Sequence, residues 1–154
     1  MTKEFPIVEG SNLEGRRFTL PEDLEGQLNI VFIPVKRYQQ LIVEGWIPFI
    51  EKLTNIYPKL EFYEVSSLAK GYMLTRFLID GGMRVGFPSK KARERTIILH
   101  VSNNDIKENL EIRDENTIYL FLLTENGKII FREEGAITSE KAKRLEQIIR
   151  ENLN

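Results

Sequence analysis

The sequence contains no cysteine at any of its 154 positions. This absence excludes disulfide bonds, catalysis by a thiolate, and metals or clusters held by cysteine. Histidine occurs once, at His100, and no spacing of His, Asp and Glu predicts a metal site, so neither a metal nor a cofactor is expected. No apolar run approaches the roughly 20 residues of a membrane-spanning helix. With no hydrophobic signal region in the first residues, the sequence predicts a cytoplasmic protein without a membrane span.

The composition is that of an ordinary globular domain. Hydrophobic residues make up 42% and charged residues 29% of the chain, and the formal net charge is −1. A charge this close to zero gives no general attraction to nucleic acid or to anionic membranes, so neither is predicted as a partner. The length suits one domain over residues 1–154. Within it, the glycine- and proline-containing residues 1–27 are expected to form an N-terminal arm or hairpin.

Strands and helices alternate along the chain. Apolar, β-branched runs at residues 28–33 and 96–101 predict strands buried on both faces. The alternating residues 60–67 predict a third strand. Apolar residues at helical spacing predict helices at residues 41–57, 69–80 and 138–153, with a short one after Ser102. The basic residues between the second helix and the 96–101 strand are expected to form a loop.

A hairpin is predicted near the C-terminus, where two β-rich runs flank Asn126-Gly127. Asn and Gly both tolerate positive φ, which favours a tight antiparallel turn. The alternation before the hairpin favours a mainly parallel sheet with helices on both faces. The predicted fold class is therefore α/β, a three-layer α/β/α sandwich whose mixed sheet ends in an antiparallel hairpin and a helix.

Three stretches resemble the thioredoxin-like superfamily. The first is similar to a peroxiredoxin opening, the second to the helix and strand that follow the thioredoxin active site, and the third to the closing hairpin and helix. The residues that carry the likeness are Leu24, Gly26, Phe32 and Pro34 in the first stretch, Pro48, Leu53 and Tyr57 in the second, and Asn126, Gly127 and Gly135 in the third. Their order implies a thioredoxin-like fold over nearly the whole chain.

The C-terminal part also resembles the mitochondrial ATP synthase assembly-factor family, a thioredoxin-like group that need not act as an oxidoreductase. The likeness rests on Asn126-Gly127, Gly135, Thr138 and Glu140. The sequence departs from that family at residues 130–132, where Ile-Phe-Arg stands in place of an Ile-Arg-Trp run.

The resemblance places no sulfur at any position where the thioredoxin-like fold holds its nucleophile. Alternative registers put the reactive positions at Gln40 and Val43, at Arg37 and Gln40, or near Leu41. The cis-proline of that fold corresponds to Thr117-Ile118, where no proline occurs. Because none of these side chains can form a thiolate, thiol–disulfide exchange and thiol peroxidase activity are excluded.

The first functional hypothesis is a redox-inactive thioredoxin-like module that binds an unidentified protein, in assembly or as a chaperone. The surface predicted for this partner combines the loop that replaces the active site with the residues before the hairpin: Lys36, Arg37, Tyr38, Gln39, Gln40, Asn116, Thr117 and Ile118. Arg and Tyr are common anchors of protein interfaces, and a following helix N-terminus favours anions. Edge strands and the arm would also permit a homodimer.

The competing hypothesis is a non-thiol enzyme, or a protein that binds a small anionic ligand. His100 ends a predicted strand, where ligand crevices of open α/β sheets lie, and Arg84 or Arg37 would hold the anion. The basic run from residue 84 to 95 could also hold an anion, although charge runs in loops are more often solvated surface. A deep polar pocket converging on His100 would favour this hypothesis, whereas a flat or filled site would favour binding.

Overall fold

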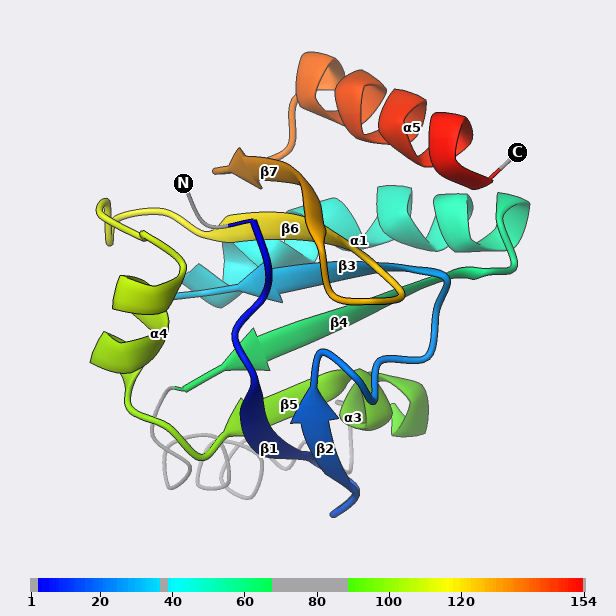
Figure 1. The fold of residues 1–154 in the computed structure, drawn as a ribbon. Helices are drawn as coiled ribbons and strands as arrows, with labels where there is room; N and C mark the ends of the chain where they lie inside the picture. The colour runs from blue at the N-terminus through cyan, green and yellow to red at the C-terminus, as the bar shows by residue number, and fades with distance from the viewer. Residues whose placement is uncertain (1–2, 37–38, 68–88, 154) are drawn as a thin grey trace.

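The computed structural model describes residues 3–36, 39–67 and 89–153. In these ranges the chain forms one seven-stranded mixed sheet with the strand order β2-β1-β5-β4-β3-β6-β7 (Figure 1). The strands are β1 (Val8–Asn12), β2 (Arg17–Leu20), β3 (Leu28–Ile33), β4 (Leu60–Ser66), β5 (Thr96–Leu99), β6 (Tyr119–Thr124) and β7 (Ile129–Glu134). The helices are α1 (Gln40–Ile56), α3 (Lys90–Arg95), α4 (Asn103–Asn109) and α5 (Ser139–Leu153).

The centre of the sheet is parallel and its flanks are antiparallel. β3 pairs in parallel with β4, and β4 pairs in parallel with β5. β6 runs antiparallel to β3, and β1 runs antiparallel to β5. All six residues of β3 are buried, as the continuous apolar run predicts. The predicted α/β fold, with β3 and β5 in one sheet, is confirmed.

Side chains of the central strands alternate between two cores. Ile30 and Phe32 face α1 and α5, and they pack with Trp46 of α1 among others. Val31 and Ile33 face the opposite side, where the N-terminal segment and α4 cover the sheet. The sheet therefore lies between two layers, and the alternation of one strand supplies both cores. Among the described residues, no helix combines the length and apolar character needed to cross a bilayer.

The basic segment expected to be a loop is partly helical. α3 covers Lys90–Arg95, and the Ser89 hydroxyl caps it by accepting a hydrogen bond from Ala92 N–H at 3.1 Å. Lys, Ala, Arg and Glu are good helix formers, so the capped segment folds as a helix despite its charge. The strand predicted over residues 96–101 ends at Leu99. The helix predicted over residues 69–80 lies outside the described residues.

The predicted hairpin is present, with β6 and β7 antiparallel and a tight turn at Asn126-Gly127. Gly127 has φ +85°, whereas Asn126 is not among the described residues with positive φ. Gly127 N–H donates to Thr124 O at 2.9 Å, and Thr124 N–H donates to Lys128 O at 2.9 Å. In this turn the positive φ is needed only at the glycine that closes it, although Asn126 would also tolerate it.

Candidate functional site

The carboxyl ends of the parallel strands lie along one edge of the sheet, at the side where Figure 1 shows α4 and the start of α1. The segment before β6 reaches the same edge, because Ile33 at the end of β3 pairs with Tyr119 at the start of β6. We call the described residues 35–41, without 37 and 38, together with residues 114–118, the carboxyl edge. In open α/β sheets this edge is where ligands and partners bind.

Gln39 ties the two halves of the carboxyl edge together. Its side chain is fully buried. The Oε1 atom accepts hydrogen bonds from Val35 N–H at 2.8 Å and from Lys36 N–H at 3.1 Å, and the Nε2 atom donates to Glu115 O at 2.7 Å. A residue predicted to contact a partner therefore lies beneath the surface, where it fixes the loop after β3 against the segment before β6.

The segment before β6 is held from below as well. The Tyr119 hydroxyl donates to Asp114 O at 2.8 Å and accepts from Asp114 N–H at 3.2 Å. Burial is the main cause that raises the pKa of Tyr119, so the hydroxyl stays protonated and keeps its donor. Lys107 of α4 forms a 3.1 Å ion pair with Glu115. These contacts hold the segment before β6 against β6 and α4.

Arg132 of β7 supports the turn that precedes this segment. Its guanidinium donates to Leu110 O at 2.6 Å and to Glu111 O at 2.9 Å. Glu111 has φ +55°, an uncommon conformation for a residue other than glycine. The two hydrogen bonds satisfy the carbonyls that this conformation turns toward the sheet.

The remaining predicted residues differ in exposure. Asn116 is exposed, Lys36 and Thr117 are half-buried, and Ile118 is fully buried, so Ile118 cannot itself reach a partner. Gln40 Nε2 donates to Glu64 Oε1 at 2.7 Å. Arg37, Tyr38 and Arg84 lie outside the described residues.

Sequence reasoning considered Leu41 only as a position for the lost nucleophile, yet it is a prominent surface residue. Its side chain, in the first turn of α1, is 74% exposed. That turn carries no acidic residue, and no side chain caps it. The helix N-terminus therefore adds positive potential beside an apolar side chain. A long exposed aliphatic side chain at the start of an amphipathic helix was the available signal.

The positions where a thiol would stand carry other chemistry. Val43 is fully buried in the core, and Gln40 is bonded to Glu64. The cis peptide bond in the described part of the chain is Leu20-Pro21, and Thr117-Ile118 is trans. The groove-shaping cis-proline of thioredoxin-like enzymes thus has no counterpart here.

His100 lies at the same edge of the sheet but on the side of β5 and β1. Its Nε2 atom is 3.2 Å from Ser11 Oγ, and its backbone N–H donates to Glu9 O at 2.8 Å. The side chain is exposed. Neither of the two pockets described for the structure is lined by His100. No described pocket converges on the histidine, and such a pocket is the feature that would favour the enzyme hypothesis.

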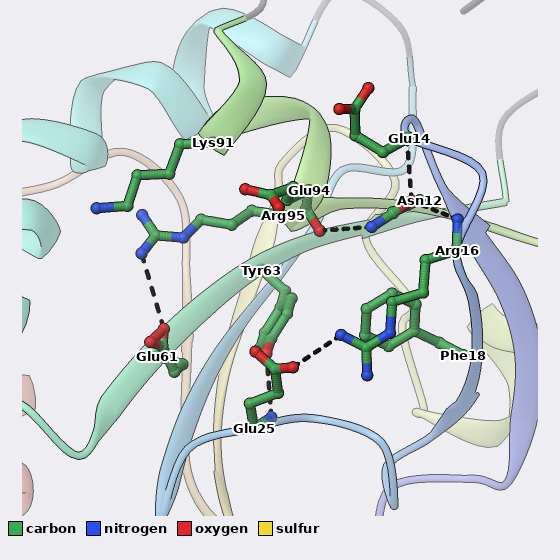
Figure 2. Close-up of a pocket in the computed structure, with 10 residues that line it drawn as sticks. All are labelled: Asn12, Glu14, Arg16, Phe18, Glu25, Glu61, Tyr63, Lys91, Glu94 and Arg95. Carbon is green, nitrogen blue, oxygen red and sulfur yellow. Dashed lines mark hydrogen bonds and ion pairs between the residues drawn. The ribbon is translucent and has the colours of Figure 1, made fainter.

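A pocket lies at the opposite edge of the sheet, at the amino ends of β4 and β5 (Figure 2). Its volume is about 320 Å³, and Lys91 and Arg95 of the predicted basic segment line it. The sequence indicated the cations, but not that they lie against a pocket whose other walls come from β1, β2 and β4.

Solved structures with the same architecture are thioredoxin-like. The chain is similar to a thiol:disulfide interchange protein from Bacteroides sp., with 17% identity, a TM-score of 0.64, and coverage of 97% of this chain and 90% of that chain. It is similar to the thioredoxin domain of a thiol-disulfide oxidoreductase from Bacteroides vulgatus, with 17% identity, a TM-score of 0.60, and coverage of 99% and 97%. It is also similar to BsSco, a member of the Sco family of cytochrome c oxidase assembly proteins, with 13% identity, a TM-score of 0.65, and coverage of 96% and 94%. Likeness at these identities shows the fold alone.

Comparison at the level of sequence gives one match and one negative result. The sequence model of the ATP10 protein family matches residues 2–151. No curated protein matches the chain significantly.

Proposed function

The chain belongs to the ATP10 protein family, and on this premise we propose that it is a redox-inactive assembly module that binds another protein at its carboxyl edge. This is the assembly-factor family that the C-terminal hairpin and helix resemble. The observation that carries the proposal is the buried Gln39 side chain, whose three hydrogen bonds hold the loop where thioredoxin-like enzymes keep their thiols.

A chain without cysteine cannot form the mixed disulfide through which thioredoxin-like oxidoreductases act. What such a scaffold retains is the surface that met the substrate protein. The likeness to BsSco, whose name places it among assembly proteins, supports an assembly role on this fold.

The surface chemistry indicates the kind of partner. Leu41 offers an exposed aliphatic side chain, and Lys36 lies on the loop before it. The uncapped N-terminus of α1 adds positive potential at the same place. We therefore expect a partner segment that carries an apolar side chain next to an acidic one. Burying a leucine side chain contributes about 1.5–3 kcal/mol, enough to change affinity at least tenfold.

The test compares two exposed aliphatic residues on one helix. Leu41→Ala removes the side chain at the carboxyl edge, and Ile56→Ala removes one that is 55% exposed at the far end of α1. The tagged protein is purified from its native cell, and bound proteins are identified by mass spectrometry. A partner confirmed by titration with purified protein should bind about tenfold or more weakly to Leu41→Ala and unchanged to Ile56→Ala.

The opposite results would reject the proposal. Equal binding to both variants would remove the carboxyl edge from the interface. Catalytic reduction of a disulfide or a peroxide by the purified chain would contradict the proposal that the chain is redox-inactive. The sequence-predicted residues are tested in the same assay with Arg37→Ala and Tyr38→Ala, and His100→Ala checks that the histidine is not needed.

A further inference from the structure

The pocket in Figure 2 lies away from the carboxyl edge and is not used by the proposed function. It is formed by the hairpin of β1 and β2, the residue Glu25 before β3, the start of β4 and one face of α3. Asn12 closes one wall, because its Nδ2 donates to Glu94 O at 3.2 Å and its Oδ1 accepts from two hairpin N–H groups. Its volume of about 320 Å³ is at the lower end of the range for small-molecule sites.

Arg95 is the unusual residue of this pocket. Its side chain is only 16% exposed, and its guanidinium lies 4.1 Å from the centre of the Phe62 ring. The nearest carboxylate oxygen, Glu61 Oε2, is 3.7 Å away, which is an ion-pair distance but too long for a hydrogen bond. Among the described residues, no acceptor lies within hydrogen-bond distance of the guanidinium. No buried side-chain nitrogen or oxygen of the described residues lacks a hydrogen-bond partner, so the guanidinium donors of Arg95 reach the solvent of the pocket, where a ligand can accept from them.

Lys91 places a second cation beside the first. It lies one helical turn before Arg95 on α3, and Figure 2 shows both side chains extending in the same direction. No carboxylate of the described residues lies within ion-pair distance of its ammonium. Like charges four residues apart on a helix repel each other, so an anion bound between them would be favoured.

The other cations at the pocket are already paired. Arg16 forms a 2.7 Å ion pair with Glu25, and Arg93, just outside, forms a 3.0 Å pair with Glu14. This leaves Lys91 and Arg95 facing an anion, while Glu94 and Glu61 lie near them. The nearby carboxylates disfavour a second negative charge in the site, so a monoanion suits it better than a divalent phosphate.

We propose that this pocket binds a small carboxylate, held by the Arg95 fork and the Lys91 ammonium. A carboxylate matches the planar donor pair of arginine and can accept two parallel hydrogen bonds. It displaces Glu61, whose oxygen at 3.7 Å gives Arg95 only a long ionic contact. The stacking of Arg95 on Phe62 fixes the fork in advance, which lowers the entropic cost of binding.

The experiment is an NMR titration of the full chain with acetate, inorganic phosphate or sodium chloride at matched ionic strength. Acetate should shift the Arg95 Nε–Hε signal and the amides of α3 in a saturable manner, with a dissociation constant in the millimolar range. Phosphate should bind more weakly, and chloride should cause no saturable shift. Arg95→Gln should weaken acetate binding about tenfold or more, because charge-assisted bidentate hydrogen bonds are lost.

Controls separate binding from folding. Lys91→Gln should weaken acetate binding severalfold, and Arg95→Lys should bind weakly while keeping the positive charge. Arg150→Gln changes an exposed arginine on α5 and should leave acetate binding unchanged. Acetate shifts no larger than those with chloride, tighter binding of phosphate than of acetate, or an equal loss in Arg150→Gln would each overturn the proposal.

Discussion

Replacing Gln39 by alanine tests the central structural claim, because this residue joins the two halves of the carboxyl edge. The change removes hydrogen bonds to Val35 N–H, Lys36 N–H and Glu115 O, at 2.8, 3.1 and 2.7 Å. Each such bond contributes about 0.5–1.5 kcal/mol, so the free energy of unfolding should fall by about 2–4 kcal/mol. A domain of ordinary stability, about 5–15 kcal/mol, would remain folded.

The assay is urea unfolding followed by fluorescence, with hydrogen exchange of the Val35 and Lys36 amides as a local readout. Both amides should exchange faster in Gln39→Ala, because their acceptor is gone. Gln27→Ala is the matched control, since that glutamine is exposed and its side chain has no described hydrogen bond. If the free energy of unfolding of Gln39→Ala lay within about 0.5 kcal/mol of the Gln27→Ala value, the structural role assigned to Gln39 would be refuted, because three hydrogen bonds should contribute more.

Gln39→Glu extends the same test, because it makes the stability contributed by the side chain of residue 39 depend on pH. The introduced carboxylate would face the Glu115 carbonyl, so burial and repulsion would raise its pKa in the folded state above the value of about 4.3 in the unfolded chain. The destabilisation should be absent below that unfolded value, where the group is protonated in both states, and complete above the folded pKa. Equal destabilisation at acid and neutral pH would show that Nε2 of Gln39 is not the donor.

Three further predictions concern residues outside this loop. Arg132→Lys loses the fork that reaches two carbonyls at 2.6 and 2.9 Å, and should lower the free energy of unfolding by about 1–3 kcal/mol, against less than about 0.5 kcal/mol for exposed Arg150→Lys. Burial raises the pKa of Tyr63 to about 12, so the stability present below pH 10 should fall by roughly 2–3 kcal/mol as pH rises through 12. Tyr63→Phe should show a smaller fall over that pH range, and an identical fall would contradict the assignment. Gly127→Ala combines a φ of +85° with a Cβ that would collide with Cγ of Pro21, and calorimetry should show a lower melting temperature than for the wild type.

Much of the fold was predictable because its signals are local. The six apolar residues of β3 and the alternating runs around Gly127 each define a strand by their own pattern. The basic segment was predicted to be a loop because charge runs are more often loops. Its helix depends on the Ser89 cap and on the good helix formers that follow it. The Asn-Gly pair indicated the position of the turn, and the structure shows that Gly127 alone of the two has a positive φ.

The sites were less predictable, because their residues are defined by distant partners. Gln39 and Gln40 are chemically identical neighbours, but the buried Gln39 donates to Glu115 O, 76 residues along the chain, whereas Gln40 donates to Glu64. The environment of Arg95 likewise depends on Phe62 in β4. A single sequence without these contacts could indicate a polar loop and a basic run, but not which side chain is structural and which is available.

The carboxyl edge also shows how a thioredoxin-like fold without cysteine holds the loop after β3 in place. In an enzyme of this fold, the loop after β3 must present a reactive atom, and the loop conformation serves that atom. Here an amide side chain fixes the same loop from inside, with Oε1 and Nε2 of Gln39 bonded to the two segments that border the site. Because Gln39 is buried and Leu41 is exposed, Leu41 can be substituted without disturbing the hydrogen bonds that Gln39 makes. In the function proposed above, partner recognition and loop stability would therefore reside in different side chains, which is an arrangement that suits a binding module.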